Sequence, residues 1–395
     1  MKKGSSPRVC IIRRAYYPAE SHVRRNAETL VQAGYAVGVI CLRNCGESAR
    51  EVVDGVSVYR LPLRTRRAGV LRYIIEYSIF FLMASVAVTW LHIRHSYAVV
   101  EADSMPDFLV FAGLIPRLSG ARVILYLFES MPEMWAQKRR LSMAHWAVRF
   151  LCWTEHISCG FADRVICCHE MARLALVGRG VPEGKIIVVL NVPDERVFRS
   201  DVCRATTDNH GALRLIQHGT ITENYGIQIV LRALQLLVPT LPVHFDIVGD
   251  GEYRRELQSL TEELGLQNYV TFHGFVSRER LLELLCRAQV GIVPMLLEYQ
   301  SPNKLFEFVA LGKPVIASDL ETFRQHFSEN EICYFRRGDP HDLARVIERA
   351  VQQPSRTHEF AQRAMERYNC YRWARMSQRY LGVYNELLAT RGRKL

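Results

Sequence analysis

The sequence contains no pair of cysteines spaced as Cys-x-x-Cys, although it has 11 cysteines among its 395 residues. That spacing is typical of zinc ribbons and of thioredoxin-like redox sites, so its absence argues against both classes. Several of the cysteines lie in apolar runs such as Val165–Cys168, where buried and unreactive free thiols are expected. Scattered free thiols are typical of a reducing cytoplasm, which we take as the expected compartment.

Repeats, low-complexity tracts and long hydrophobic runs are also missing. The apolar run nearest the N-terminus, Val9–Ile12, is far too short for the core of a signal peptide. The stretch Tyr77–Leu91 has 15 residues without a charge, whereas a helix that crosses a bilayer needs about 20. We therefore expect a helix over Val70–Leu91 that is buried in its domain or lies at a membrane surface, in preference to one that spans the membrane.

Acidic residues are too few to balance the basic ones. The chain has 51 Lys+Arg and 40 Asp+Glu, a net charge of +11, and residues 1–100 hold 15 basic and 6 acidic residues, or +9 of that excess. Such an asymmetry predicts a basic face for an anionic partner. Nucleic acid is disfavoured because no recognised binding module is present. Four arginines lie in Arg60–Arg67, either to attract anionic lipid beside the apolar helix or as a solvated loop.

Short apolar runs alternate with helical patterns along most of the chain, which is typical of parallel sheets covered by helices. Residues 193–212 break this pattern and read as a linker. The sequence therefore predicts an α/β fold of two doubly wound, Rossmann-like domains, 1–192 and 213–370, with ligands in the cleft between them and a final helix in 371–395. The predicted strands are Val9–Ile12, Val37–Leu42, Val56–Leu61, Tyr97–Val100, Val123–Phe128, Val165–Cys168, Ile186–Leu190, Leu213–Gln217, Val243–Val248, Tyr269–His273, Val290–Pro294 and Val315–Ala317.

The most informative segment begins at Tyr299 and reads Tyr-Gln-Ser-Pro-Asn-Lys-Leu-Phe-Glu. Ser301 suits a helix N-cap, Pro302 suits the first helical position, and Gly312 suits the end of the helix. Lys304 then stands in the first turn, where a cation opposes the helix dipole, and such a broken rule is typical of a functional site. A lysine beside free helical N–H groups favours a diphosphate. Glu307, one turn later, suits two ribose hydroxyls because an ionised carboxylate only accepts hydrogen bonds.

This segment resembles the donor-binding signature of the retaining glycosyltransferases of family 4, which have the GT-B fold, and especially the branch with Ser-Pro-x-Lys-Leu-x-Glu. Further segments are similar to that family in the same order along nearly the whole chain. They begin at Ser104, Glu129, Asn191, His218, Ile247 and Phe272.

The resemblance implies two Rossmann-like domains, an acceptor side followed by a nucleotide-sugar side, and a last helix that crosses back onto the first domain. It implies transfer of a sugar from a nucleotide-diphosphate sugar with retention of anomeric configuration, with no cofactor and no required metal. Lys304 would neutralise the departing diphosphate and Glu307 would hold the ribose. The implied donor-binding residues are Gly219, Thr220, Tyr225, Gly249, Phe275, Val276, Tyr299, Ser301, Pro302, Asn303, Lys304, Leu305 and Glu307.

The sequence departs from the family pattern on both sides of the reaction. Tyr299 stands where the common form has a carboxylate, and Thr220 and Tyr225 replace an arginine and a lysine, so Lys304 would be the main diphosphate cation. On the acceptor side, the group that takes the proton is left open among four carboxylates. We assign Lys304, Glu307, Glu129 and Glu101 as catalytic candidates, and the four proton acceptors considered are Glu101, Asp103, Glu129 and Glu133.

Three functions are compatible with these features. The leading hypothesis is a cytoplasmic glycosyltransferase, peripheral at the inner face of an anionic membrane, which acts on a lipid-linked or polysaccharide acceptor. A nucleotide-sugar epimerase of the same fold would convert the donor without an acceptor. A non-catalytic nucleotide-sugar-binding subunit would bind the donor without turnover.

Overall fold

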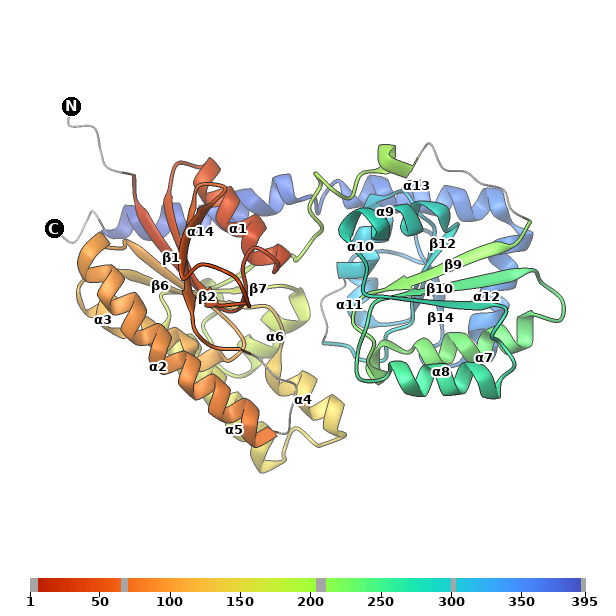
Figure 1. Ribbon diagram of the computed structural model, residues 1–395, viewed down its shortest axis with the longest axis horizontal. Helices are drawn as coiled ribbons and strands as arrows, with labels where there is room; N and C mark the ends of the chain where they lie inside the picture. Colours follow the sequence, from red (N-terminus) through yellow and green to blue (C-terminus); the bar gives the residue numbers. More distant parts are fainter. Residues whose placement is uncertain (1–5, 65–69, 204–210, 300–302, 392–395) are drawn as a thin grey trace. The chain divides into compact units, whose positions relative to one another are not determined.

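The computed structural model describes residues 6–64, 70–203, 211–299 and 303–391, and these form two compact units. The first unit comprises residues 1–191 and 374–395, and the second comprises residues 192–373. The chain therefore leaves the first unit once and returns to it at its C-terminal helix. Each unit is an α/β body built on a largely parallel sheet, so the predicted fold class is confirmed (Figure 1).

The first unit is built on an eight-stranded sheet in the order β3-β4-β2-β1-β5-β6-β7-β8. All neighbouring strands are parallel except β3, which forms an antiparallel hairpin with β4. The strands are β1 (Arg8–Tyr16), β2 (Ala36–Leu42), β3 (Arg50–Val53), β4 (Val56–Leu61), β5 (Val99–Asp103), β6 (Arg122–Leu127), β7 (Arg164–Cys167) and β8 (Ile186–Val188). The order reverses between β1 and β5, where open α/β sheets bind ligands beyond their strand ends.

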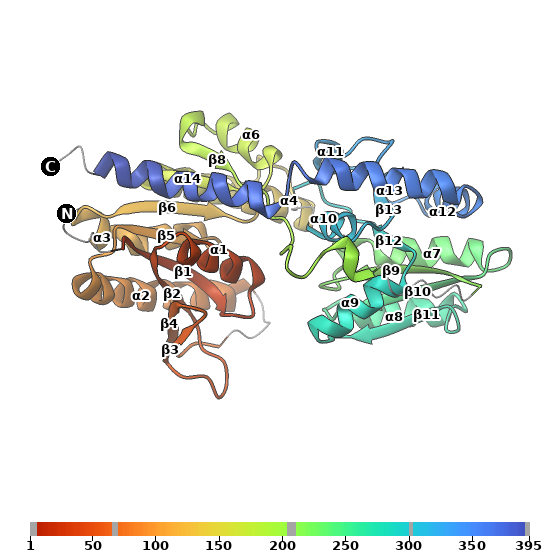
Figure 2. The same ribbon diagram turned by 90° about the horizontal axis from the view of Figure 1, so that it is seen from above.

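Helices cover both faces of this sheet. They are α1 (Ser21–Gln32), α2 (Val70–His95), η1 (Asp107–Gly113), α3 (Leu114–Leu118), α4 (Met131–Arg139), α5 (Trp146–Phe161), α6 (Glu170–Gly178), η2 (Glu183–Lys185) and α14 (Trp373–Arg391). Buried side chains of α2, η1, α5 and α6 join one hydrophobic core with the strands, so these four elements cover the same face. Figure 2 shows α14 along β6 on the side of the sheet opposite α2.

The second unit has a six-stranded sheet in the order β11-β10-β9-β12-β13-β14. Its strands, all parallel, are β9 (Leu213–His218), β10 (Val243–Val248), β11 (Val270–Gly274), β12 (Val290–Val293), β13 (Val315–Ser318) and β14 (Cys333–Phe335). Its helices are η3 (Ser200–Cys203), η4 (Glu223–Tyr225), α7 (Ile227–Leu237), α8 (Arg254–Glu263), α9 (Arg278–Arg287), α10 (Asn303–Ala310), α11 (Glu321–Arg324), α12 (Pro340–Gln352) and α13 (Pro354–Tyr368). The order reverses between β9 and β12, which makes their carboxyl ends the second switch point.

Every strand predicted from the sequence is present, within two residues at most ends, and two short strands were missed. β3 is charged at its start and pairs on one side only, and its turn at Asp54-Gly55 was the available signal. β14 has three residues at a sheet edge, too few for a periodic pattern. The expectation of free thiols is wrong for one pair: Cys203 of η3 and Cys286 of α9 form a disulfide with a Cα–Cα distance of 4.8 Å.

The apolar helix predicted over Val70–Leu91 is α2, which continues to His95. From Arg72 to His95 it has a mean hydropathy of 1.8 in its most apolar window, of which 22% is buried. By length and composition alone it is one candidate membrane span among the described residues. Its inner side chains, Phe80, Ala84, Val88 and Leu91, belong to the core of the first unit, however, so α2 is also an integral helix of that unit.

Candidate active site

Helix α10 carries the two charged residues of the predicted donor signature. Leu305, Phe306, Phe308 and Val309 are buried, whereas Lys304 and Glu307 are only half-buried. The sequence therefore divides the helix into an apolar face that packs on the unit and a charged face. The predicted ligand Leu305 lies entirely in the apolar face. Ser301 and Pro302 lie outside the described residues, which resume at Asn303.

Lys304 lies against the turn that follows β9. Its Nζ is 3.3 Å from the centre of the Tyr225 ring. A Cβ atom added to Gly219 would stand 2.5 Å from Cε of Lys304, so only glycine leaves room for the lysine there. Burial lowers the pKa of Lys304 to about 7, against the attraction of Glu307. Nζ is buried and has no hydrogen-bond partner among the described residues. A buried ammonium held in this way is costly until an anion joins it.

Glu307 faces His218, the last residue of β9. Its Oε2 is 3.1 Å from Nε2 of His218. Burial raises the pKa of Glu307 to about 7, although the positive charge of Lys304 favours the ionised form. Burial, and then the charge of Lys304, lowers the pKa of His218 to about 3, so the imidazole is neutral at pH 7. His218 also packs edge-on against Phe308, which fixes its ring beside the carboxylate.

His218 is a site residue that the sequence did not assign. The available signal was its position directly before Gly219, at the carboxyl end of a predicted strand. A single histidine at a strand end is most often a buried structural residue, and sequence alone gave no reason to pair it with Glu307, 89 positions later. The pairing follows from the sheet order, which sets β9 beside β12, the strand before α10.

Glycines bring the turns after β9 and β10 close together. Gly219 has φ of 111° and Gly249 has φ of 132°, in the region that favours glycine. A Cβ atom on Gly249 would stand 1.9 Å from the carbonyl oxygen of Gly219, so no other residue fits. The amide of Gly219 donates to the carbonyl of Val248 and that of Gly249 donates to Gly274. The two turns present backbone without side chains next to Lys304. A phosphate group could therefore approach the backbone closely there.

The remaining predicted donor residues lie on loops of the same unit. Phe275 and Val276 directly follow β11, and the Phe275 side chain is 90% exposed. Thr220 is exposed directly after Gly219, and Tyr299 is half-buried ahead of α10. The described contacts thus bring together Lys304, Glu307, Gly219, Tyr225, Gly249 and the newly found His218. Among the described residues, no hydrogen bond or ion pair joins Thr220, Phe275 or Val276 to that cluster.

On the first unit, Glu101 is fully buried in β5 and belongs to the docking of the last helix. Tyr380 and Tyr384 of α14 donate hydrogen bonds of 2.9 and 2.7 Å to its two carboxylate oxygens. Burial raises its pKa above the usual range, although the two hydroxyls favour the ionised form. Its position therefore favours a structural role over the catalytic one that the sequence predicted.

The other three carboxylates differ in their surroundings. Asp103 is buried close to Glu101, and burial together with that charge raises its pKa well above the usual range. Glu133 forms an ion pair with Arg179, which also binds Glu155, so it belongs to a charge network among helices. Glu129 lies two residues after β6 and is half-buried, and burial raises its pKa although Arg13 favours its ionised form. No hydrogen bond or ion pair holds Glu129 among the described residues.

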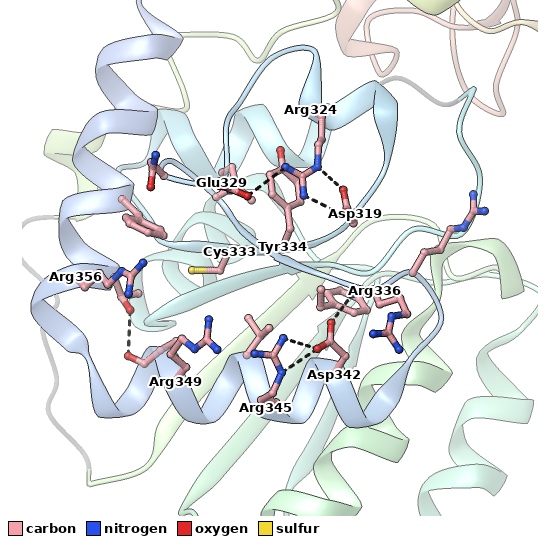
Figure 3. Close-up of a pocket in the computed structure, with 18 of the residues that line it drawn as sticks. Asp319, Arg324, Glu329, Cys333, Tyr334, Arg336, Asp342, Arg345, Arg349 and Arg356 are labelled. Carbon is pink, nitrogen blue, oxygen red and sulfur yellow. Dashed lines mark hydrogen bonds and ion pairs between the residues drawn. The ribbon is translucent and has the colours of Figure 1, made fainter.

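A separate pocket of about 690 Å³ lies over β14, between α12 and α13 (Figure 3). Six arginines line it, and four of them pair with carboxylates: Arg324 with Asp319 and Arg345 with Asp342 at 2.5 Å each, Arg336 with Asp339 at 3.1 Å, and Arg337 with Glu298 at 3.3 Å. None of the predicted donor residues lines this pocket. Among the described residues, no group of three or more His, Cys, Asp or Glu side chains is placed to hold a metal ion.

Two doubly wound sheets, with a buried lysine and a bare glycine turn at the switch point of the second, define a protein of the GT-B class. Two family models match the chain: "Glycosyl transferase 4-like domain" over residues 19–191 and "Glycosyl transferases group 1" over residues 212–353. Together they span most of both units. The chain belongs to the glycosyltransferases of the GT-B fold.

Curated relatives agree with this assignment. The chain is 22% identical over 408 aligned residues to the phosphatidylinositol N-acetylglucosaminyltransferase gpi3 subunit of Schizosaccharomyces pombe, covering 95% of this chain and 79% of the relative. It is 28% identical to D-inositol 3-phosphate glycosyltransferase of Thermomonospora curvata, covering 58% of each.

Solved structures show the same fold at lower identity. Sucrose-phosphate synthase from Thermosynechococcus elongatus matches with a TM-score of 0.80 at 19% identity, covering 97% of this chain and 100% of that one. Anabaena HepE in complex with UDP-glucose matches with a TM-score of 0.72 at 15% identity, covering 96% and 99%. At these identities the similarity shows the fold alone.

Proposed function

We propose that this glycosyltransferase transfers a sugar from a nucleotide-diphosphate sugar to a lipid-linked or polysaccharide acceptor, with retention and without a metal. The observation that carries the proposal is the Lys304 ammonium, which is buried without a hydrogen-bond partner among the described residues. It lies against the bare turn at Gly219, where a diphosphate would supply the missing anion.

Lys304 then has a defined role in the reaction. When the bond between the sugar C1 and the diphosphate oxygen breaks, negative charge grows on the leaving group. A fixed cation at that place stabilises the transition state more than the ground state, and no metal is needed to neutralise the charge. Glu307, positioned by neutral His218, accepts hydrogen bonds from the ribose hydroxyls of the donor.

The acceptor side rests on different support. Glu129 follows β6, next to the switch point of the first sheet, and lies free of the networks that hold Glu101 and Glu133, so we assign it to the acceptor proton. The names of relatives favour a lipid-linked acceptor, since phosphatidylinositol appears in that of the S. pombe subunit and in that of a Mycobacterium leprae mannosyltransferase, 27% identical over 172 residues. Retention rests on the resemblance of the Ser301–Glu307 signature to retaining enzymes.

A thermal-shift screen with UDP, GDP, ADP and TDP tests the donor site. One of these nucleotides should raise the melting temperature of the wild-type chain, and Lys304→Ala should abolish the rise while leaving the unliganded melting temperature nearly unchanged. Lys313→Ala is the matched control. Lys313 Nζ donates to the carbonyls of Cys286 and Ala288, each at 2.7 Å, so its loss should lower the unliganded melting temperature and keep the ligand response. An intact response in Lys304→Ala would refute the site.

The corresponding nucleotide sugars then separate the three functions. If the nucleoside diphosphate is released only when an acceptor is present, and is still released in EDTA, the result supports metal-free transfer. The NMR coupling of the anomeric proton in the product then shows whether the configuration is retained. Conversion of the donor without acceptor would establish the epimerase. Donor binding without turnover under any acceptor would establish the non-catalytic subunit, for which Tyr299 in place of a carboxylate is the motivating feature.

A further inference from the structure

Helix α5 of the first unit exposes large aromatic side chains that an ordinary surface helix would bury. Its solvent face carries Trp146, Phe150 and Trp153, which are 76%, 58% and 57% exposed. Its inner face includes the buried Glu155, which pairs with Arg179. The three aromatic residues recur at spacings of four and three, so they form one stripe along the helix. A soluble surface helix normally shows the opposite arrangement.

Helix α2 carries a second apolar stripe. Ile75, Ile79, Leu82, Val86 and Ile93 are all exposed, on the side of the helix opposite the buried Phe80, Ala84, Val88 and Leu91. The stripe runs over 19 residues, from Ile75 to Ile93, or about 27 Å of helix. Next to the end of α2, three exposed residues of α3 extend the apolar surface: Leu114, Ile115 and Leu118.

The two stripes belong to one side of the first unit. The 3-10 helix η1 contacts both α2 and α5, with Phe108 against Phe81 on one side and Phe111 against Phe161 on the other. The inner faces of α2, η1 and α5 share one core with the sheet. Their outer faces therefore point away from the sheet in the same direction, and Figure 1 shows α2, α3 and α5 at one side of the unit. We call the exposed apolar residues of α2, α3 and α5 the apolar face.

Basic side chains stand beside the aromatic stripe. Lys138, Arg139 and Arg140 are exposed at the end of α4, only a few residues before Trp146, and Arg149 is exposed on α5 itself. The exposed Met143 lies between these two groups. Tryptophan and phenylalanine next to lysine and arginine are the composition of a helix that lies in the headgroup region of an anionic bilayer.

We propose that the apolar face docks the first unit onto an anionic lipid bilayer, with α2 and α5 lying in the plane of the interface. The aromatic and aliphatic side chains would enter the boundary between headgroups and acyl chains, and the exposed Arg139, Arg140 and Arg149 would meet lipid phosphates. A spanning α2 is disfavoured because its withdrawal would uncover the core around Phe80 and Val88. This inference does not depend on the transfer reaction.

In the basic segment Arg60–Arg67, which the sequence offered for lipid, Arg60 has a different position. Arg60 is buried and pairs with Glu47 and Glu51, at 3.1 and 2.5 Å, and it also donates to the carbonyl of Tyr17. It therefore holds the β3–β4 hairpin and cannot meet a membrane. Arg64 is exposed, and Arg66 and Arg67 lie outside the described residues. We assign the lipid-facing charges to Arg139, Arg140 and Arg149, which lie beside the aromatic stripe and which the sequence did not single out.

The test is flotation of the full chain with vesicles of phosphatidylcholine, with or without phosphatidylglycerol. Wild type should bind the anionic vesicles about tenfold or more better than the neutral ones, and less in high salt. The variant Trp146→Ser/Phe150→Ser/Trp153→Ser should lose at least about tenfold of the binding to both vesicles. Arg139→Gln/Arg140→Gln/Arg149→Gln should lose the preference for anionic vesicles. Because the replaced side chains are exposed, both variants should keep the wild-type melting temperature.

Leu236→Ser is the matched control, since Leu236 is an exposed apolar residue on α7 of the second unit, and it should bind like wild type. Equal vesicle binding by wild type and the aromatic variant would overturn the proposal. So would a wild-type chain that self-associates without lipid and becomes monomeric in the aromatic variant, because the apolar face would then be an interface between copies. Resistance of membrane-bound protein to alkaline carbonate would also overturn it, in favour of a span.

Discussion

Glu101 of the first unit and Glu307 of the second are carboxylates with the same perturbation and different surroundings. Burial is the largest cause that raises the pKa of each. Both oxygens of Glu101 accept hydrogen bonds from tyrosine hydroxyls of α14. Glu307 instead stands between a buried ammonium and a neutral imidazole, with a fifth of its side chain open to solvent.

The difference teaches what a raised pKa does and does not show. A perturbed carboxylate marks a functional site only when its hydrogen-bonding capacity is unused by the protein. Both oxygens of Glu101 already accept hydrogen bonds that hold the C-terminal helix against the sheet. The cluster of Glu307, Lys304 and His218 retains unused capacity, because Lys304 Nζ is buried and lacks a hydrogen-bond partner among the described residues.

The strongest test of this comparison is Glu307→Ala. It should weaken binding of the nucleoside diphosphate by about ten- to a hundredfold, since hydrogen bonds to a charged acceptor contribute roughly 1.5–3 kcal/mol. The unliganded melting temperature should hold or rise, because a half-buried carboxylate is removed. Isothermal titration calorimetry measures the first and thermal denaturation the second. Glu101→Gln serves as the comparison variant and should bind the nucleotide like wild type.

If Glu101→Gln weakened binding as much as Glu307→Ala, the distinction between a structural and a functional carboxylate would be wrong. A large fall in melting temperature for Glu307→Ala would also contradict it, since Glu307 would then be part of the packing.

The fold and one half of the donor site followed from the sequence for definite physical reasons. Parallel strands buried on both faces produce near-continuous apolar runs, which is why twelve strands could be placed. The α10 segment could be placed because Pro302 favours the start of a helix and Gly312 favours its end. Lys304 was distinctive because its positive charge opposes the helix dipole.

What the sequence could not predict was contact between distant positions. His218 contacts Glu307 only because the sheet order sets β9 beside β12. A structural role for Glu101 is indicated only because α14 returns to the first unit and donates hydrogen bonds to it. Arg60 looked like a lipid-binding residue because the sequence does not show that Glu47, before β3, and Glu51, on β3, pair with it. The aromatic stripe of α5 escaped notice because periodicity shows an apolar face without saying which way it points.

The next test concerns the two hydrogen bonds that tyrosines of α14 donate to Glu101. Replacing Tyr380 and Tyr384 together by phenylalanine removes both donors to Glu101 and leaves a buried carboxylate without them. The free energy of unfolding should fall by about 2–3 kcal/mol, because a buried acceptor then lacks its partners. Chemical denaturation measures this loss. Tyr334→Phe is the control for a single lost tyrosine hydroxyl in the second unit, where Tyr334 donates to the carbonyl of Phe327, and it should cost about 1 kcal/mol.

Nucleotide binding should be unchanged in the Tyr380→Phe/Tyr384→Phe variant at temperatures where it is folded. A variant as stable as wild type would show that α14 is held by its apolar contacts alone, and Glu101 would regain its place among the catalytic candidates.

The last effect expected is a gradual change in stability with pH. The pKa of Glu101 is raised from its ordinary value of 4.5 to about 7, so the folded chain holds this proton where the unfolded chain releases it. The stabilisation is therefore complete below pH 4.5 and is lost as pH rises to about 7, with a slope of up to about 1.4 kcal/mol per pH unit. Urea denaturation at several pH values measures this slope, and Glu101→Gln should reduce it by removing the Glu101 proton and its effect on Asp103.

Glu307 should contribute a loss of the same sign over the same pH range, since its pKa is also raised to about 7. The nucleotide then separates the two carboxylates. Ribose hydroxyls that donate to Glu307 favour its ionised form, so saturating nucleoside diphosphate should abolish the slope that Glu307→Gln removes and leave the slope that Glu101→Gln removes. A nucleotide that changed both slopes, or neither, would show that the ribose does not meet Glu307.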